Sequence, residues 1–266
     1  MLTINEYRKV ESLEEAYELN QKKNNKIIAG GVWMKIGDRR IATAIDLSGL
    51  GLDQITETDT EFVIGAMTTL REIEKHAGLA AYTDGAIRES VRHIVGVQFR
   101  NCATVGGSIF GRFGFSDVLT VFLAMDTQVE LYHAGMVSLK EFIDMPYDND
   151  ILVALHVAKK PIRIAYLSQR NTATDFPVGA CAVSEYDGSL HVSIGARPVH
   201  ARLVELPLGS GEPDSFGKQL SEGFEKDEAL VKELATWCAD QFTYGSNRRA
   251  GADYRKHVAG VLIRRA

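Results

Sequence analysis

Residues 98–108 read Gln98-Phe99-Arg100-Asn101-Cys102-Ala103-Thr104-Val105-Gly106-Gly107-Ser108. The glycine pair lacks the Cβ atoms that would keep a ligand away from the backbone. Thr104 and Ser108 flank the pair with hydroxyls that can donate to phosphate oxygens. The nearby Asp117 is a candidate acceptor for a ribose hydroxyl, the role of an acidic residue in dinucleotide-binding folds. An Ω-loop packed by its own aromatic side chains is the structural alternative for this segment.

A second glycine pair lies earlier in the chain, in Lys26-Ile27-Ile28-Ala29-Gly30-Gly31-Val32-Trp33. The β-branched residues predict a short strand over 26–29, which the glycines end. Successive N–H groups in such a loop can form an anion nest suited to a pyrophosphate. A glycine pair on its own is more often a turn, so only the two loops together indicate a binding site.

The composition excludes several classes of protein. The chain has 266 residues, of which 45% are hydrophobic and 24% charged, as in a globular protein of one large domain or two small ones. Its formal charge of −5 is opposite to the balance of a basic nucleic-acid-binding domain. No apolar run reaches the roughly 18 residues of a membrane span, and the first residues do not resemble a signal peptide. We therefore expect a cytoplasmic protein with no nucleic-acid or membrane partner.

Other familiar motifs are missing. Cys102, Cys181 and Cys238 are far apart in the sequence, which predicts free thiols rather than disulfides. An iron–sulfur cluster held by this chain alone would normally need four thiolates. The segment Gly106–Gly111 has the glycine spacing of a P-loop, but Arg112-Phe113 follow it where Lys and Ser or Thr are required. The seven histidines have no ligand-like spacing, so we predict no metal site.

Helices and strands are mixed along the chain, which predicts an α+β protein with antiparallel sheets. Periodicity predicts helices over 12–20, 70–76, 84–92, 225–239 and 251–264, and strands over 26–29, 42–47, 61–66, 128–132, 151–157, 162–167, 179–186 and 190–196. Residues 96–117 read as a long loop, and 119–124 form a short apolar segment. Ser12 with Glu15 predicts a capping box, and Asp187-Gly188 predicts a two-residue hairpin.

Further helix starts and one boundary follow from single residues. Thr68 or Thr69 is expected to cap the helix over 70–76, and Asp84 the helix over 84–92. Pro161 marks a boundary, which predicts one domain over 1–160 and a second, α+β domain over 161–266.

The two glycine loops together resemble the FAD-binding subunit of the molybdenum hydroxylases, the enzymes of the xanthine dehydrogenase and carbon monoxide dehydrogenase type. The resemblance is carried by Ala29-Gly30-Gly31 after a strand, by Gln98-x-Arg100-Asn101-x-Ala103-Thr104-x-Gly106-Gly107-Ser108, and by Asp117. Ile64-Gly65-Ala66-Met67-Thr68-Thr69-Leu70 is similar to the family's strand-to-helix step, and residues 254–266 to its C-terminal helix. The resemblance therefore covers nearly the whole chain.

This resemblance implies a fold and a site. The fold would be the two-subdomain FAD-binding module of the p-cresol methylhydroxylase type, with subdomains over about 1–56 and 57–160, followed by a C-terminal domain with a three-stranded antiparallel sheet and helices. FAD would lie between the subdomains. The pyrophosphate would contact Lys26, Ile27, Ile28, Ala29, Gly30, Gly31, Val32 and Trp33 on one side and Thr104, Gly106, Gly107 and Ser108 on the other. Asp117 would contact the adenosine part, Ile94 and Val95 the isoalloxazine ring, and Ile151 or Leu152 the adenine end.

The chain departs from the family pattern at several positions. Val32 and Trp33 stand where the family usually has Thr or Ser followed by Asp or Asn, so one hydroxyl contact is lost. Phe110, Arg112, Phe113 and Phe115 stand where the second loop often has small residues and Pro before the Asp. A family lysine near the flavin would fall around Pro177.

The resemblance also implies a function: an oxidoreductase subunit that is active as part of a complex. A molybdopterin-binding large subunit would hydroxylate the substrate, a [2Fe–2S] small subunit would carry the electrons, and FAD on this chain would pass them to NAD or another acceptor. The redox chemistry belongs to the cofactor, so no catalytic acid or base is named. Two alternatives stay open: a structural or assembly subunit that binds FAD weakly or not at all, and a stand-alone flavin oxidase.

Overall fold

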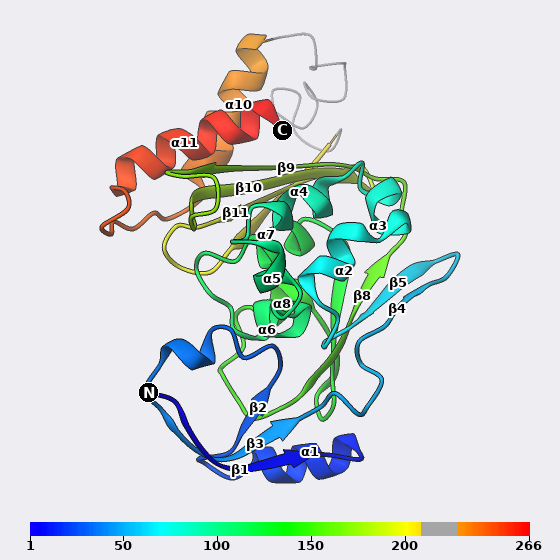
Figure 1. Ribbon diagram of the computed structural model, residues 1–266. Coiled ribbons are helices and arrows are strands. Elements are labelled where there is room, and N and C mark those ends of the chain that lie inside the picture. The colour runs from blue at the N-terminus through cyan, green and yellow to red at the C-terminus, as the bar shows by residue number, and fades with distance from the viewer. Residues whose placement is uncertain (209–227) are drawn as a thin grey trace. The chain divides into compact units, whose positions relative to one another are not determined.

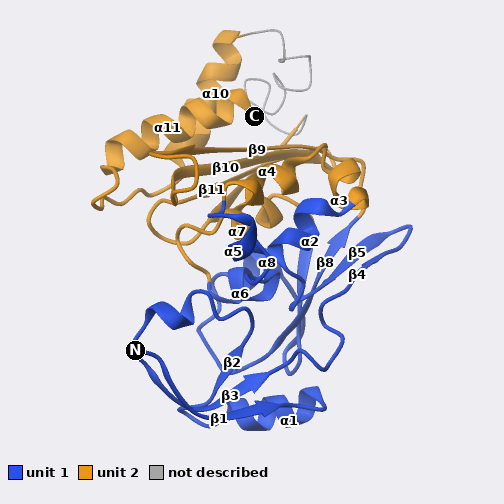
Figure 2. Ribbon diagram, viewed as in Figure 1, with its two compact units in different colours: residues 1–76, 94–111, 127–158 blue, residues 77–93, 112–126, 159–266 orange. Residues whose placement is uncertain are grey.

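The computed structural model describes residues 1–208 and 228–266 (Figure 1). The chain divides into two compact units that alternate along the sequence (Figure 2). The first unit contains Met1–His76, Ile94–Gly111 and Thr127–Ala158, and the second contains Ala77–His93, Arg112–Asp126 and Lys159–Ala266. The domain boundary that we predict at residue 160 stays a prediction. No helix in the described ranges is both long enough and apolar enough to cross a membrane.

The first unit begins with a three-stranded parallel sheet in the order β1-β3-β2, made of β1 (Thr3–Lys9), β3 (Arg40–Asp46) and β2 (Lys26–Ile28). The expectation of antiparallel sheets is wrong here. The helix α1 (Leu13–Asn20) connects β1 to β2, and such a crossover lets consecutive strands run parallel. The buried side chains of Ala16 and Ile45 pack together in the core of this sheet and helix.

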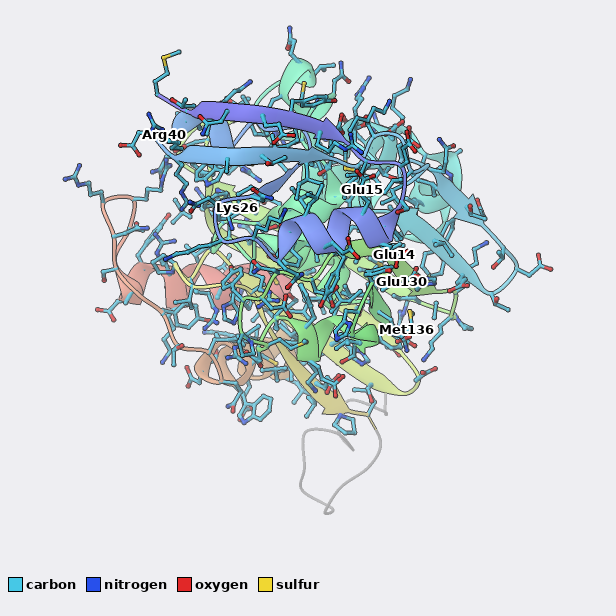
Figure 3. All side chains as sticks on the ribbon, turned by 90° about the horizontal axis from the view of Figure 1, so that it is seen from below. Glu14, Glu15, Lys26, Arg40, Glu130 and Met136 are labelled. Atoms are coloured by element: carbon cyan, nitrogen blue, oxygen red, sulfur yellow. The ribbon has the colours of Figure 1, made fainter. Side chains whose placement is uncertain are left out.

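The start of α1 is only partly as predicted. The Ser12 hydroxyl accepts a hydrogen bond from the backbone N–H of Glu15 at 3.1 Å, which confirms Ser12 as the N-cap. The Glu15 carboxylate accepts from the N–H of Glu11 at 2.9 Å, whereas a capping box would join it to Ser12. Glu14 and Glu15 lie in the first turn of α1, which Figure 3 shows from below.

The first unit also holds a five-stranded antiparallel sheet in the order β4-β5-β8-β6-β7. Its strands are β4 (Ile55–Glu57), β5 (Glu61–Gly65), β8 (Leu152–Ala158), β6 (Thr127–Leu131) and β7 (Gly135–Ser138), and the short helices of this unit are η1 (Met34–Ile36), α2 (Leu70–Lys75), α5 (Val97–Arg100), α6 (Val105–Phe110) and α8 (Leu139–Phe142). Thr69 caps α2 in a complete capping box with Glu72.

The loop predicted over 96–117 contains two helices, α5 and α6, and the first residue of a third. The prediction of a long loop is therefore wrong. Helices of four and six residues are too short to show the period of an amphipathic helix, and α6 contains the glycine pair that otherwise disfavours helix.

The second unit is built on a four-stranded antiparallel sheet in the order β12-β11-β10-β9. Its strands are β9 (Arg163–Arg170), β10 (Pro177–Tyr186), β11 (Ser189–Gly195) and β12 (Arg202–Pro207), and its helices are α3 (Ala77–Tyr82), α4 (Ala86–Arg92), α7 (Asp117–Leu123), α10 (Glu228–Asp240) and α11 (Ala252–Arg265). The three expected strands are present, and β12 extends the sheet by a fourth. Residues 225–227 of the predicted helix over 225–239 lie outside the described residues.

Helices cover both faces of this sheet (Figure 1). On one face, Cys181, Val192 and Ile194 pack against α10 and α11, and α4 and α7 lie on the other. Cys181 and Cys238 are buried free thiols, whereas Cys102 is exposed. Burial raises the pKa of the Cys238 thiol to about 12, so this thiol is neutral and unreactive. Asp84 does not cap α4, since the N-cap is Gly85.

The hairpin predicted at Asp187-Gly188 is confirmed. Tyr186 pairs with Ser189 across it, and φ is 49° at Asp187 and 68° at Gly188. Two positive φ values in a two-residue loop define a type I′ turn, whose twist matches that of the strands.

Replacing Gly188 with alanine is expected to lower the free energy of unfolding by about 1 kcal/mol, because a Cβ disfavours the left-handed conformation. Chemical denaturation followed by circular dichroism measures this change. Gly260→Ala is the matched control, since Gly260 lies within α11 and an added Cβ would meet no atom closer than 3.9 Å. This control should be neutral or stabilising, and an equal loss in both variants would contradict the explanation.

Candidate functional site

The structure brings the two glycine loops into direct contact in the first unit. A Cβ added to Gly30 would lie 1.7 Å from the carbonyl oxygen of Cys102 and 3.0 Å from the backbone nitrogen of Ala103. Only glycine allows two backbones to approach this closely. The loop over 29–33 and the segment over 102–108 therefore lie against each other at Gly30 and Cys102.

The first loop offers backbone donors. Lys26, Ile27 and Ile28 form β2, and the residues after them turn away through Gly31, whose φ is +64°. Within the described residues, no carbonyl or side chain accepts from the N–H groups of Gly30, Gly31 and Val32. Residues 26–32 are half-buried and Trp33 is exposed. Adjacent unpaired N–H groups in a loop with a left-handed glycine are the donor set that binds phosphate oxygens.

The second loop is different, because most of its amides already have acceptors. The N–H of Val105 donates to Thr68 O at 2.9 Å and that of Gly106 to Ala66 O at 2.8 Å. The N–H of Gly107 donates to the Thr104 hydroxyl at 3.1 Å. These bonds fix α6 on the strand-to-helix step after β5, and a Cβ on Gly106 would lie 2.6 Å from Ala66 O.

Thr104 and Ser108 contribute the side-chain hydroxyl groups of the second loop. Thr104 Oγ1 accepts one bond and keeps its own proton as a donor. The Ser108 hydroxyl donates to Thr104 O at 2.9 Å, a local bond that a half-buried serine can exchange for a ligand. Gly107 is exposed between them. The predicted roles of Thr104, Gly106, Gly107 and Ser108 stay predictions.

Ile94 and Val95 lie in the turn between α4 and α5. Val95 is 47% exposed and has a φ of 48°, which is a strained conformation for a β-branched residue. Such strain persists only where the surroundings enforce it, and it is frequent at ligand-binding sites. The sequence contains no signal for this conformation.

A buried ion pair that no sequence motif indicates is hydrogen-bonded to this turn through Arg100. The guanidinium of Arg100 donates to both carboxylate oxygens of Glu74, with Nε–Oε2 at 2.8 Å and Nη2–Oε1 at 3.3 Å. Burial would raise the pKa of Glu74, but the hydrogen bonds from Arg100 and Arg71 outweigh burial and hold this pKa below its ordinary value. The Glu74 carboxylate is therefore ionised at neutral pH.

The remaining candidates are buried. Asp117 is the first residue of α7 in the second unit, and its Oδ1 accepts from Tyr166 and, at 2.6 Å, from Arg170. Ile151 packs in the core beside the parallel sheet, and Leu152 is buried in β8. These side chains have structural partners in the described structure, and their contacts with the adenosine part stay predictions.

The residues of the two loops fit the pyrophosphate of a dinucleotide such as FAD. They supply three unpaired N–H donors and two hydroxyls. Neither loop contains a carboxylate that would repel a phosphate. Any side chain at Gly30 would collide with the backbone of the second loop. The exposed Val95 supplies an apolar surface of the kind that an aromatic ring packs on.

Comparisons with known proteins agree with this geometry. A family model described as "FAD binding domain in molybdopterin dehydrogenase" matches residues 3–159, which is more than half of the chain. The uncharacterized protein YgfM of Escherichia coli K12 is 24% identical over 271 residues, which cover 98% of this chain and 94% of YgfM. The carbon monoxide dehydrogenase medium chain of Afipia carboxidovorans is 28% identical over 282 residues, which cover 98% of this chain and 94% of the relative.

A solved structure is similar over the whole length. Reconstituted CO dehydrogenase from Oligotropha carboxidovorans contains a chain that matches with a TM-score of 0.83 at 23% identity, and the match covers 99% of this chain and 96% of that one. The predicted α+β fold is thereby confirmed.

Proposed function

Because the chain belongs to the family of FAD-binding domains in molybdopterin dehydrogenases, we propose that it is the FAD-binding subunit of a multi-subunit molybdenum hydroxylase. As a member of this family the chain has FAD as its cofactor, and it is an oxidoreductase subunit. The observation that carries the proposal is the contact between Gly30 and Cys102, which brings together two loops with phosphate-binding groups.

Each part of the site has a separate task in binding FAD. The N–H groups of Gly30, Gly31 and Val32 bind the pyrophosphate, and the hydroxyls of Thr104 and Ser108 add donors beside Gly106 and Gly107. Ile94 and Val95 pack on the isoalloxazine ring. The other predicted contacts are Lys26, Ile27, Ile28, Ala29, Trp33, Asp117, Ile151 and Leu152. When bound, FAD supplies the redox chemistry, and the residues of the chain bind and orient it.

The proposed partners are a molybdopterin-binding large subunit and a [2Fe–2S] small subunit. Electrons reach this chain from the clusters of the small subunit and leave to NAD or another acceptor. The relative in Afipia carboxidovorans supports this arrangement, since its name describes one chain of a carbon monoxide dehydrogenase.

The visible absorption spectrum of the purified full chain tests the proposal. We expect the bands of a bound flavin at about one FAD per chain, with FAD identified as the released chromophore after denaturation. Co-purified chains would then identify the partners. A chain that stays colourless after incubation with FAD would contradict the proposal and favour a structural or assembly subunit. Val32→Thr with Trp33→Asp would then test whether these two side chains are the cause.

A further inference from the structure

The turn over 93–96 holds Val95 in an unfavourable backbone conformation, which a neighbouring group must stabilise. Val95 combines a φ of 48° with an exposed side chain, so packing of its own side chain does not account for the conformation. In the left-handed region a Cβ comes too close to the following carbonyl oxygen, and a β-branched residue tolerates this less than others.

Arg100 is the group that reaches this turn from inside. Its Nη1 donates to the carbonyl oxygen of Ile94, the residue before Val95, at 3.2 Å. The other side of the same guanidinium binds Glu74 at two points. The exposed fractions of the two side chains are only 6% and 8%. A planar guanidinium held at two points by a buried carboxylate has one orientation left, so its third donor holds the Ile94 carbonyl at a fixed place.

We propose that Arg100 is a positioning residue that, held by Glu74, fixes the turn at Ile94 and presents Val95 to the isoalloxazine ring of FAD. The inference rests on the proposed function, since it assigns the ring to this turn. Arg100 does not itself touch the cofactor in this proposal. It acts through the backbone of Ile94, and its removal should affect the ring end of FAD more than the pyrophosphate.

The chain offers a matched control for the charge. Arg71 pairs with the same carboxylate, with Nη1 2.9 Å from Glu74 Oε2, but its side chain is 34% exposed. Among the described residues no hydrogen bond joins Arg71 to the turn over 93–96. Arg71→Met therefore removes a cation from Glu74 and leaves the Ile94 carbonyl bound.

The test compares FAD with ADP, which contains the adenosine and a pyrophosphate but no flavin ring. Full-length wild-type protein, Arg100→Met, Arg100→Lys and Arg71→Met are titrated with FAD, and ADP is measured by competition. For Arg100→Met we expect FAD affinity to fall about tenfold or more, the equivalent of one hydrogen bond to a charged group. Its ADP affinity should stay within about twofold, and the visible band of bound FAD should shift. Arg100→Lys should recover part of the loss, and Arg71→Met should match wild type.

The outcomes distinguish a failure of the proposed function from a failure of the role proposed for Arg100. Wild-type protein that binds neither FAD nor ADP would contradict the proposed function and this inference together. Wild-type protein that binds FAD, with Arg100→Met unchanged or with equal losses for FAD and ADP, would overturn this inference alone.

Val95→Gly keeps the test decisive if Arg100→Met does not fold. Glycine adopts a positive φ without strain, so this variant should be at least as stable as wild type in thermal unfolding. Because the apolar contact is lost, its FAD affinity should fall while its ADP affinity is retained. An unchanged FAD affinity would contradict the assignment of the ring to this turn.

Discussion

Replacing Gly30 with alanine is expected to weaken FAD binding by the purified chain by about two orders of magnitude. The added Cβ would lie 1.7 Å from Cys102 O and 2.4 Å from the carbonyl carbon of the same residue, and both atoms belong to the backbone, which cannot rotate away as a side chain would. The two loops must therefore separate. Overpacking of this kind costs about 3 kcal/mol, and if this cost falls on the bound conformation the affinity for FAD drops by about 100-fold or more.

Flavin content per chain and a titration with FAD measure the effect. Gly37→Ala is the matched control, because Gly37 follows the same loop and an added Cβ would meet Met34 O at an ordinary 3.5 Å. This control should bind FAD as wild type does. If Gly30→Ala retained a full complement of FAD, the contact between the loops would not be part of the binding site.

The second large effect is expected from Arg170→Met, which removes one partner of a buried ion pair. The side chains of Arg170 and Asp117 are 7% and 4% exposed, with Nη2 2.6 Å from Oδ1. Burial would lower the pKa of Arg170, but the carboxylate of Asp117 outweighs burial and raises it. Without the guanidinium, Asp117 remains buried beside Tyr166. Breaking one side of such a pair lowers the free energy of unfolding by about 3–5 kcal/mol.

The sign of the pH dependence follows from burial. Burial raises the pKa of Asp117 above its ordinary value even beside Arg170, and loss of the guanidinium, whose charge lowers this pKa, raises it further. The folded variant then holds a proton that the unfolded chain releases, so its deficit relative to wild type should grow as the pH rises above about 4. Urea denaturation at several pH values measures this trend. A deficit that is independent of pH would show that Arg170 does not lower the pKa of Asp117 in the folded protein, which would contradict this explanation.

Arg163→Met is the control for this variant. Arg163 lies on the same strand, β9, and pairs with Glu185, but its side chain is 69% exposed. The loss of an exposed pair should change the stability by less than about 1 kcal/mol. A comparable loss in both variants would mean that burial of the pair is not the cause.

The sequence predicts those helices and strands whose own residues contain the turn, capping or periodicity signal. The strand pair at Asp187-Gly188 and the helix after Thr69 are confirmed, because turn and capping chemistry is local. β1 was not predicted, since all of its residues are exposed and show no alternation. β12 is likewise absent from the prediction, although half of its residues are partly buried. The sequence indicates only a short apolar segment for α7, because all seven of its residues are buried and apolar periodicity is absent.

For the site, the sequence predicted the two glycine loops but not how they join. The contact between Gly30 and Cys102 unites positions distant in the sequence, and the left-handed conformation of Val95 depends on its surroundings. The pairing of Glu74 with Arg100 is likewise tertiary. The acidity of Asp117 predicts a contact with a ribose hydroxyl, and only the structure shows that Tyr166 and Arg170 bind its carboxylate.

The alternation of the two units along the chain has a consequence for biosynthesis. The first unit has all of its segments once Ala158 has left the ribosome, but α7 belongs to the second unit and must wait for β10 and β11, the last of which ends at Gly195. At about 5–20 residues per second, synthesis from the end of α7 at Leu123 to Gly195 takes roughly 4–14 seconds. During that time a helix that is wholly buried in the finished protein has no sheet to pack on, which makes the nascent chain a substrate for chaperones that bind apolar segments.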